Sequence, residues 1–186
     1  MTSGCSSSSI SHKGQVCWIT GLSAAGKTSV AIGVTSRLRD AGKFVVHLDG
    51  DQLRELFPHF KGFERHERLS LGYQYSALAK FLSDQGAIVV VSAIALFSEI
   101  HLWNRTNIEN YLEVFLDVPM DELIRRDPKG LYRRYLSGEI ASVAGMDLKV
   151  DYPIMPDLVL THDVPRTLEE NIQSVINLFK KQVKDW

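Results

Sequence analysis

The sequence predicts an α/β fold in which a parallel five-stranded sheet carries helices on both faces. Three observations support it. Short runs rich in β-branched residues alternate with helical stretches along the chain, which is the order that builds parallel sheets. The run Ile88–Val91 is apolar throughout, as expected for a strand buried on both faces. A glycine-rich turn, Gly21–Thr28, joins the first strand to the first helix, where such folds bind phosphate groups.

The first half of the chain gives the expected elements in order. Val16–Thr20 is a short, β-rich apolar run and is the first expected strand. A helix is expected from about residue 27 to residue 40, and Gly42 ends it, because glycine is favoured just past a helix C-terminus. Phe44–Leu48 is the second expected strand. A long helix is then expected over about residues 64–85, directly before Gly86.

The second half continues the alternation. Ile88–Val91 is the third expected strand, and residues 103–105 fall in a helix that follows it. Tyr111–Leu116 and Leu158–Leu160 are the fourth and fifth strands. The last helix runs from residue 167 to about residue 183. It opens on Thr167 and Glu170, the spacing of a capping box.

The domain organisation follows from composition. Residues 1–14 are rich in serine and predict a disordered N-terminal tail, so a single domain is expected over residues 15–186. Asp127–Pro156 combines prolines, glycines and many charges. Long irregular segments in compact domains are usually functional lids or disordered. We expect a mobile lid here, at about residues 127–156, with a helix around Leu131–Leu136.

Composition excludes several classes of function. The chain has 186 residues, 45% of them hydrophobic, and a formal net charge of −1. A general binder of nucleic acid polymers is usually strongly basic. The longest apolar stretch, Ala87–Phe97, is shorter than the roughly 20 residues that span a bilayer. Two cysteines cannot form a disulfide scaffold, and the N-terminus lacks a signal-peptide pattern. We expect a cytoplasmic protein without a membrane partner.

The turn Gly21–Thr28 matches G-x(4)-G-K-[ST] without departure, and it lies between an expected strand and an expected helix. Its glycines let the backbone wrap a phosphate chain, and its N–H groups supply positive potential. The Lys27 ammonium reaches the β- and γ-phosphates, and the Thr28 hydroxyl is placed for Mg²⁺. The sequence therefore predicts a P-loop NTPase fold. The predicted triphosphate-binding residues are Gly21, Leu22, Ser23, Ala24, Ala25, Gly26, Lys27, Thr28 and Ser29.

Two carboxylates follow the second expected strand. Asp49 and Asp51 stand in the run Leu48–Arg54, and ligands of open α/β sheets gather at the carboxyl ends of strands. Such carboxylates are suited to accepting a proton from a substrate hydroxyl or to holding hydrated Mg²⁺. The alternative is a helix N-cap beside a surface acid. Arg54 follows and is suited to an anionic substrate.

The third signal is a basic block, Arg125–Arg134, at the start of the expected lid. It holds five cations in ten residues. Phosphoryl transfer depends mainly on positioning and charge neutralisation with water excluded, which suits closure of this block over a triphosphate. A solvated charge run is the alternative interpretation of the block alone.

In combination these blocks resemble the adenylyl-sulfate kinase (APS kinase) family. The resemblance is carried by Gly21–Thr28, Leu48–Arg54, Arg126–Tyr132 with a following Ser137–Ile140, and the end of the lid around Ala144–Asp147. It implies a nucleotide-kinase-like fold of the P-loop class. It also implies transfer of the ATP γ-phosphate to the ribose 3′-hydroxyl of a nucleotide, with Mg²⁺, usually in a homodimer.

The resemblance also assigns roles by position. Asp51 is implied as the acid that orients or deprotonates the 3′-hydroxyl, with Lys27 and Lys129 as the catalytic cations. Arg126 is implied on the ATP side. The metal ligands are implied to be Thr28 and Asp51. The implied acceptor-binding residues are Asp49, Asp51, Arg54, Phe60, Arg65, Arg68, Ile94, Arg105, Lys129, Leu131 and Val143.

Departures from the family pattern concentrate in the acceptor half. Arg68 stands where the family has Asn, Ile94–Leu96 replaces Ile-Ser-Pro, and Val143–Ala144 replaces a lid Phe-Thr pair. Aromatic stacking contributes about 1–3 kcal/mol per base, so the loss of one aromatic weakens selection of a purine. The pattern is similar to a capsule-associated branch of the family that phosphorylates cytidine diphosphoramidate, and we favour that small-molecule acceptor.

Three alternatives stay open. The first is a genuine adenylyl-sulfate kinase that makes the 3′-phospho product from adenylyl sulfate. The second is an inactive ATP-binding module with an eroded acceptor site. The third is a gluconate- or shikimate-type kinase, which shares the phosphate loop but not the block Arg126–Tyr132. The six histidines show no metal-ligand spacing, so no zinc site is expected.

Overall fold

The computed structural model describes residues 13–57, 62–163 and 166–182. The predicted tail and Phe60 lie largely or wholly outside these ranges. The strands are β1 (Gln15–Thr20), β2 (Val45–Asp49), β3 (Ile88–Ser92), β4 (Tyr111–Asp117) and β5 (Leu158–Thr161). The helices are α1 (Lys27–Asp40), α2 (Gly50–Leu56), α3 (Arg65–Asp84), α4 (Ser98–Asn107), α5 (Met120–Arg126), α6 (Leu131–Leu136) and α7 (Leu168–Gln182).

The sheet confirms the predicted parallel α/β architecture. Its five strands lie in the order β2-β3-β1-β4-β5, and every neighbouring pair is parallel. All carboxyl ends therefore meet at one edge, which we call the carboxyl edge. The strand order reverses next to the central β1, and ligands of open sheets bind where it does so.

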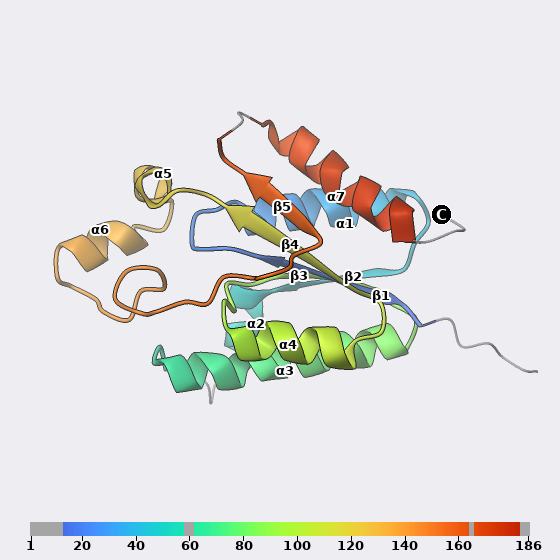
Figure 1. Cartoon of the computed structure of the whole chain (residues 1–186), viewed down its shortest axis with the longest axis horizontal. Helices are drawn as coiled ribbons and strands as arrows, with labels where there is room; N and C mark the ends of the chain where they lie inside the picture. The colour runs from blue at the N-terminus through green and yellow to red at the C-terminus, as the bar shows by residue number, and fades with distance from the viewer. Residues whose placement is uncertain (1–12, 58–61, 164–165, 183–186) are drawn as a thin grey trace, which may run out of the picture.

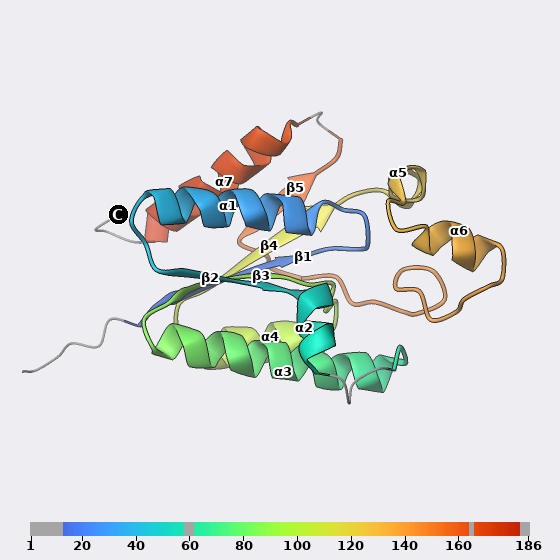
Figure 2. The same ribbon diagram turned by 180° about the vertical axis from the view of Figure 1, so that it is seen from behind.

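Helices cover both faces of the sheet. Figure 1 shows α1 and α7 on one face and α2, α3 and α4 on the other, and Figure 2 shows the same layers from behind. Each face has its own apolar cluster. The β3 backbone separates them, and its residues Val89–Ser92 are buried, as the continuous apolar run predicted.

The structure adds two helices that the sequence patterns did not predict. They are α2 and α5, each of seven residues. Segments this short show too few apolar repeats for a helical period to stand out. They matter for function because α2 begins directly after β2 and carries Asp51, while α5 ends at Arg126. Both flank the carboxyl edge in Figure 1.

The expected lid contains the helix that was predicted. α6 spans Leu131–Leu136. It lies with α5 beyond the carboxyl edge of the sheet in Figure 1. Tyr132 and Val143 are nevertheless buried and belong to the same apolar cluster as α1. The segment is therefore anchored to the core at these two side chains, and its mobility stays a prediction.

The predicted capping box at the start of α7 is confirmed. The Thr167 amide donates to Glu170 Oε2 at 2.7 Å, and the Glu170 amide donates to Thr167 Oγ1 at 3.2 Å. Within the described part of the chain, no helix has the length and apolar character needed to cross a membrane.

The contact between α1 and α7 yields a stability prediction at Gly33. A Cβ at Gly33 would lie 2.1 Å from Ile172 Cδ1. Replacing glycine inside a helix by alanine normally stabilises by roughly 0.5–1 kcal/mol, whereas overpacking a core costs about 1–3 kcal/mol. Gly33→Ala should therefore lower the melting temperature, by about 2–4 °C per kcal/mol for a domain of this size, as measured by calorimetry.

A double-mutant cycle with Ile172→Ala checks the cause of that change. If the two side chains clash, Ile172→Ala should cost less stability in the Gly33→Ala background than in the wild type. Equal costs in the two backgrounds would contradict the packing explanation.

Candidate functional site

The phosphate loop has the backbone that its glycines predicted. Gly26 is the N-cap of α1 with φ 99°, in the left-handed region that favours glycine. Gly21 has φ 148°, and a Cβ there would lie 2.8 Å from the Leu116 carbonyl oxygen. The loop therefore packs too closely on β4 for a side chain at this position.

Lys27 lies inside this loop, where its Nζ donates to the Leu22 carbonyl at 2.7 Å. Burial lowers the pKa of its ammonium to about 8, while nearby Asp51 opposes that shift and nearby Lys129 adds to it. The loop therefore holds an ammonium that is poorly solvated and gains from an anionic ligand.

A chain of hydrogen bonds ties the loop to the next two strands. Thr28 Oγ1 and Ser92 Oγ both donate to Asp49 Oδ2 at 2.8 Å, and His47 Nε2 lies 2.9 Å from Ser92 Oγ. The Asp51 amide donates to Asp49 Oδ1 at 3.0 Å. Burial acts to raise the pKa of Asp49, but these hydrogen bonds lower it overall. Asp49 is thus the N-cap of α2 and also the residue that positions Thr28.

Asp51 pairs with the expected lid. Its carboxylate forms an ion pair with Lys129 Nζ, and both side chains are well exposed, at 70% and 64%. The structure therefore joins two of the three predicted catalytic residues, Asp51 and Lys129. It also shows that Asp49, rather than Asp51, is the carboxylate in contact with the predicted metal ligand Thr28.

A second lid residue contacts the loop directly. Tyr132 is fully buried, and its hydroxyl donates to the Ser23 carbonyl at 3.1 Å. Burial raises the pKa of this phenol to about 12, so it stays a neutral donor. Nothing in the sequence singled out Tyr132, since a tyrosine within a basic block gives no signal of its own.

Arg126 lies on the other side of the phosphate loop. Its Nη1 is 3.5 Å from the Ala24 carbonyl and its Nη2 is 3.4 Å from His162 Nδ1. Glu122 accepts from both Arg125 and Arg126, and these bonds lower its pKa to about 2. The basic block is therefore partly neutralised by α5 itself.

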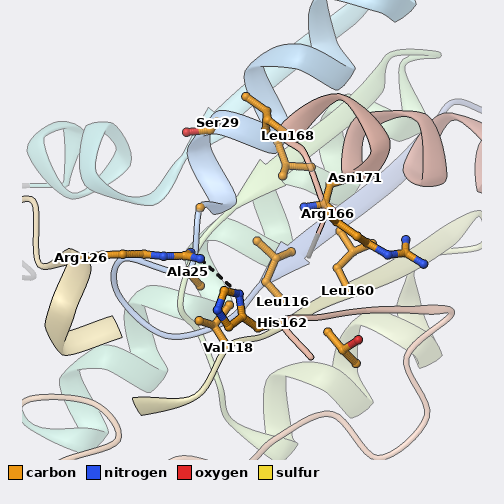
Figure 3. Close-up of a pocket in the computed structure, with 13 residues that line it drawn as sticks. Ala25, Ser29, Leu116, Val118, Arg126, Leu160, His162, Arg166, Leu168 and Asn171 are labelled. Carbon is orange, nitrogen blue, oxygen red and sulfur yellow. Dashed lines mark hydrogen bonds between the residues drawn. The ribbon is translucent and has the colours of Figure 1, made fainter. Parts of the chain in front are cut away.

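A cavity of about 270 Å³ opens beside Arg126. Figure 3 shows Arg126 and His162 at one side of it and Leu160 and Asn171 at another. Gly26 and Ser29 of the predicted triphosphate site also line it. The lining is about equally polar and apolar, and such a pocket beside a phosphate loop suits the base and ribose of a nucleotide.

Three of the four arginines predicted for the acceptor side lie near one another and are engaged by protein groups. Arg54 Nη1 donates to the Gly62 carbonyl at 3.0 Å. Arg65 forms ion pairs with Glu99 at 3.1 Å and Asp151 at 2.9 Å. Arg68 donates to two backbone carbonyls. Phe60, expected to stack on the acceptor base, is outside the described residues.

Three apolar residues were also predicted to contact the acceptor, and two of them have partly accessible side chains. Ile94 lies two residues after the end of β3 and is half-buried, as is Leu131 at the start of α6. Val143 is only 2% exposed because it packs into the apolar cluster of the α1 face. Its side chain therefore presents little surface to a base, and its role in binding the acceptor stays a prediction.

Arg105 is the clearest displacement from the predicted site. It lies in the last turn of α4, which runs back from the carboxyl edge toward the amino end of β4. There its Nη2 lies 3.3 Å from buried Glu113 and 3.0 Å from Asp157. Arg105 therefore balances a buried carboxylate and is not grouped with Asp51 and Lys129.

The fold and the sequence both have counterparts among known proteins. A family model described as adenylylsulphate kinase matches residues 13–161. Cytidine diphosphoramidate kinase of Campylobacter jejuni is 38% identical over 87% of this chain and 94% of the relative. Adenylyl-sulfate kinase of Picosynechococcus is 36% identical over 89% and 93%, respectively. The structure of Mycobacterium tuberculosis APS kinase CysC in complex with AMPPNP and APS gives a TM-score of 0.85 at 38% identity, covering 90% of this chain and 98% of that chain.

The lowered pKa of Lys27 predicts proton uptake when a nucleotide binds. The free ammonium titrates at about pH 8, and bound phosphates favour its charged form, so the pKa rises in the complex. Binding of AMPPNP should be independent of this group below pH 8 and should weaken above it, by up to about tenfold per pH unit.

Calorimetry at pH 7 and pH 9, in buffers that differ in ionisation enthalpy, measures the uptake. Lys27→Arg is the control, because an arginine stays charged at both values. Proton uptake at pH 9 that persists in Lys27→Arg would assign the effect to another group.

Proposed function

The chain belongs to the adenylylsulphate kinase family, and from that premise we propose that it transfers the γ-phosphate of ATP to the ribose 3′-hydroxyl of a nucleotide related to adenylyl sulfate. One observation carries the proposal. Asp51 of α2 and Lys129 of the expected lid form an ion pair near the ammonium of Lys27. An acid for the attacking hydroxyl and two cations for the phosphates then converge on one point of the carboxyl edge.

The proposed reaction uses these groups in order. Asp51 orients the acceptor hydroxyl and takes its proton as the oxygen attacks the γ-phosphorus, while the bond from that phosphorus to the β,γ-bridging oxygen breaks and ADP leaves. Lys129 exchanges its pairing with Asp51 for the transferring phosphoryl group, which costs little because exposed ion pairs contribute only about 0–1 kcal/mol. Lys27 neutralises the β- and γ-phosphates from inside the loop. The exchange leaves Asp51 unpaired when the acceptor arrives.

The residues present fit a divalent cation. Thr28 Oγ1 and the ionised carboxylate of Asp49 are hard oxygen donors 2.8 Å apart, and Mg²⁺ typically takes one or two such groups together with phosphate oxygens and water. Among the described residues no cluster of three acidic, histidine or cysteine side chains forms a complete cage. Bound Mg²⁺ would neutralise charge on the β- and γ-phosphates.

The cavity beside Arg126 is the proposed place of the ATP base. It opens beside the start of α1, where phosphates bind. Arg126 lies next to His162 at one side of it, and we propose that the planar guanidinium of Arg126 stacks on the base.

We favour cytidine diphosphoramidate as the acceptor. The relative in Campylobacter jejuni bears the name of that kinase. The chain lacks the lid aromatic of the family, and the Val143 that replaces it is buried, so a large base gains little stacking here. This assignment connects the protein with capsule polysaccharide modification.

Adenylyl sulfate is the second candidate acceptor. The Mycobacterium tuberculosis structure that holds APS is 38% identical to this chain, as close as the cytidine diphosphoramidate relative. Arg54 and Arg65, which are predicted to contact the acceptor, are suited to a sulfate tail and to a phosphoramidate tail alike. For either acceptor we propose a cytoplasmic homodimer, a lid over about residues 127–156, and a single kinase domain from residue 15.

An acceptor assay tests the proposal directly. Consumption of ATP is measured with cytidine diphosphoramidate and with adenylyl sulfate, and the 3′-phospho product is identified by mass spectrometry. We expect turnover with the cytidine acceptor at higher kcat/KM than with the adenosine acceptor. No turnover above the ATPase background with either acceptor would overturn the kinase assignment to this substrate class.

Asp51→Asn tests the proposed base. Loss of general base catalysis should lower kcat by about 10²–10⁴-fold and leave AMPPNP affinity within a fewfold. Asp84→Asn is a matched control, because Asp84 also pairs with a lysine, Lys80. Asp84 ends α3 near the amino end of β3, at the edge of the sheet opposite to the site. An unchanged kcat in Asp51→Asn would remove this residue from the mechanism.

A further inference from the structure

The start of α3 contacts the later part of the expected lid, residues 142–151. Arg68 Nη2 donates to the Ser142 carbonyl at 2.7 Å, and Ser142 Oγ lies 3.3 Å from Glu64 Oε1. Arg65, the first residue of the helix, pairs with Asp151 at 2.9 Å. The N-cap Glu64 and two arginines of the first turn therefore contact both ends of this segment.

Arg68 does more than contact the lid. Its Nε donates to the Phe63 carbonyl at 2.7 Å while its Nη2 donates to Ser142. One rigid, planar guanidinium thus joins the chain before α3 to the lid segment. Two guanidinium groups also contact the Phe63 ring, with Arg54 at 5.0 Å and Arg68 at 5.4 Å from its centroid. The Phe63 end of the bridge is therefore held by its side chain as well as by its carbonyl.

The lid segment that Arg68 holds is a preformed unit. Both oxygens of Asp147 accept backbone amides, from Ser142 at 2.8 Å and from Val143 at 2.7 Å. The Gly145 amide donates to the Leu148 carbonyl at 3.0 Å. Because residues 142–148 close on themselves, a contact at Ser142 positions all of them together.

We propose that Arg68 is a positioning residue that fixes the spacing between Phe63 and the segment 142–148, and that this spacing favours a pyrimidine nucleotide over a purine nucleotide as the acceptor. The inference rests on the proposed function, which places the acceptor on this side of Asp51. Arg68 acts here through its bridge between two carbonyls and not as a cation for the acceptor tail. An asparagine or a lysine cannot replace the fork, since neither donates from two nitrogens in a fixed plane.

Hydrogen exchange tests the bridge without any acceptor. In Arg68→Met, the amides of Gly145, Met146 and Leu148, which are bonded within the segment, should exchange about tenfold faster, while those of α7 stay unchanged. Arg39→Met is the matched control. Arg39 also donates from Nε and Nη2 to a carbonyl, that of Val45, but at the far end of α1. Unchanged exchange of residues 145–148 in Arg68→Met would overturn the proposal.

Nucleotide affinity tests the selection. With the ATP site saturated by AMPPNP, calorimetry gives the ratio of the dissociation constants for adenosine and cytidine 5′-monophosphate. We expect wild type and Arg39→Met to prefer the cytidine nucleotide. Arg68→Met, Arg68→Lys and Arg68→Asn should each reduce that preference by about tenfold, which corresponds to about 1.4 kcal/mol.

Two outcomes would contradict the selection. An unchanged preference for the cytidine nucleotide in Arg68→Met would show that the bridge does not determine which base binds. A preference retained by Arg68→Lys but lost in Arg68→Met would assign Arg68 to a charge contact with the ligand. Both measurements use binding and exchange alone. Failure of the wild type to transfer phosphate would therefore count against the proposed function, whereas the role of Arg68 depends only on the exchange rates and the affinity ratios.

Discussion

The carboxylate of Asp49 is the interaction on which the arrangement of the site depends. It is buried, and it accepts hydrogen bonds from the first helix through Thr28, from β3 through Ser92 and from α2 through the Asp51 amide. A buried carboxylate must be satisfied or neutralised, and here its donors come from three different elements. Meeting that requirement fixes the phosphate loop against the carboxyl ends of β2 and β3. It also sets the start of α2, and therefore the place of Asp51.

The lid combines strong and weak attachments. Tyr132 and Val143 are buried in the core, and removing such side chains from an apolar environment is costly. The pair of Asp51 and Lys129 is exposed on both sides, so its separation costs little. The expected lid is therefore held to the core by buried side chains, while the exposed pair of Asp51 and Lys129 can separate as the proposed reaction requires.

The acceptor side is organised by arginines that hold backbone and carboxylate groups of the protein itself. Arg65 and Arg68 connect the first turn of α3 to the lid, and Arg54 flanks Phe63. A guanidinium donates in several directions from one plane, so a single side chain fixes the distance between two segments. The departure from the family pattern at Arg68 therefore changes how these segments are connected as well as their charge.

The family resemblance named Asp51 and Lys129, whereas the fold and the phosphate loop were predictable from the order of residues itself. They follow from local patterns, because a buried strand, a capping box at Thr167 and G-x(4)-G-K-T each lie within a few adjacent residues. Only the folded chain shows which carboxylate contacts Thr28, why Arg105 balances buried Glu113 instead of joining the site, and that Val143 is buried. It also reveals the roles of Ser92 and Tyr132. Those outcomes depend on contacts between residues far apart in the chain and on the direction of each side chain, which the linear order of residues does not record.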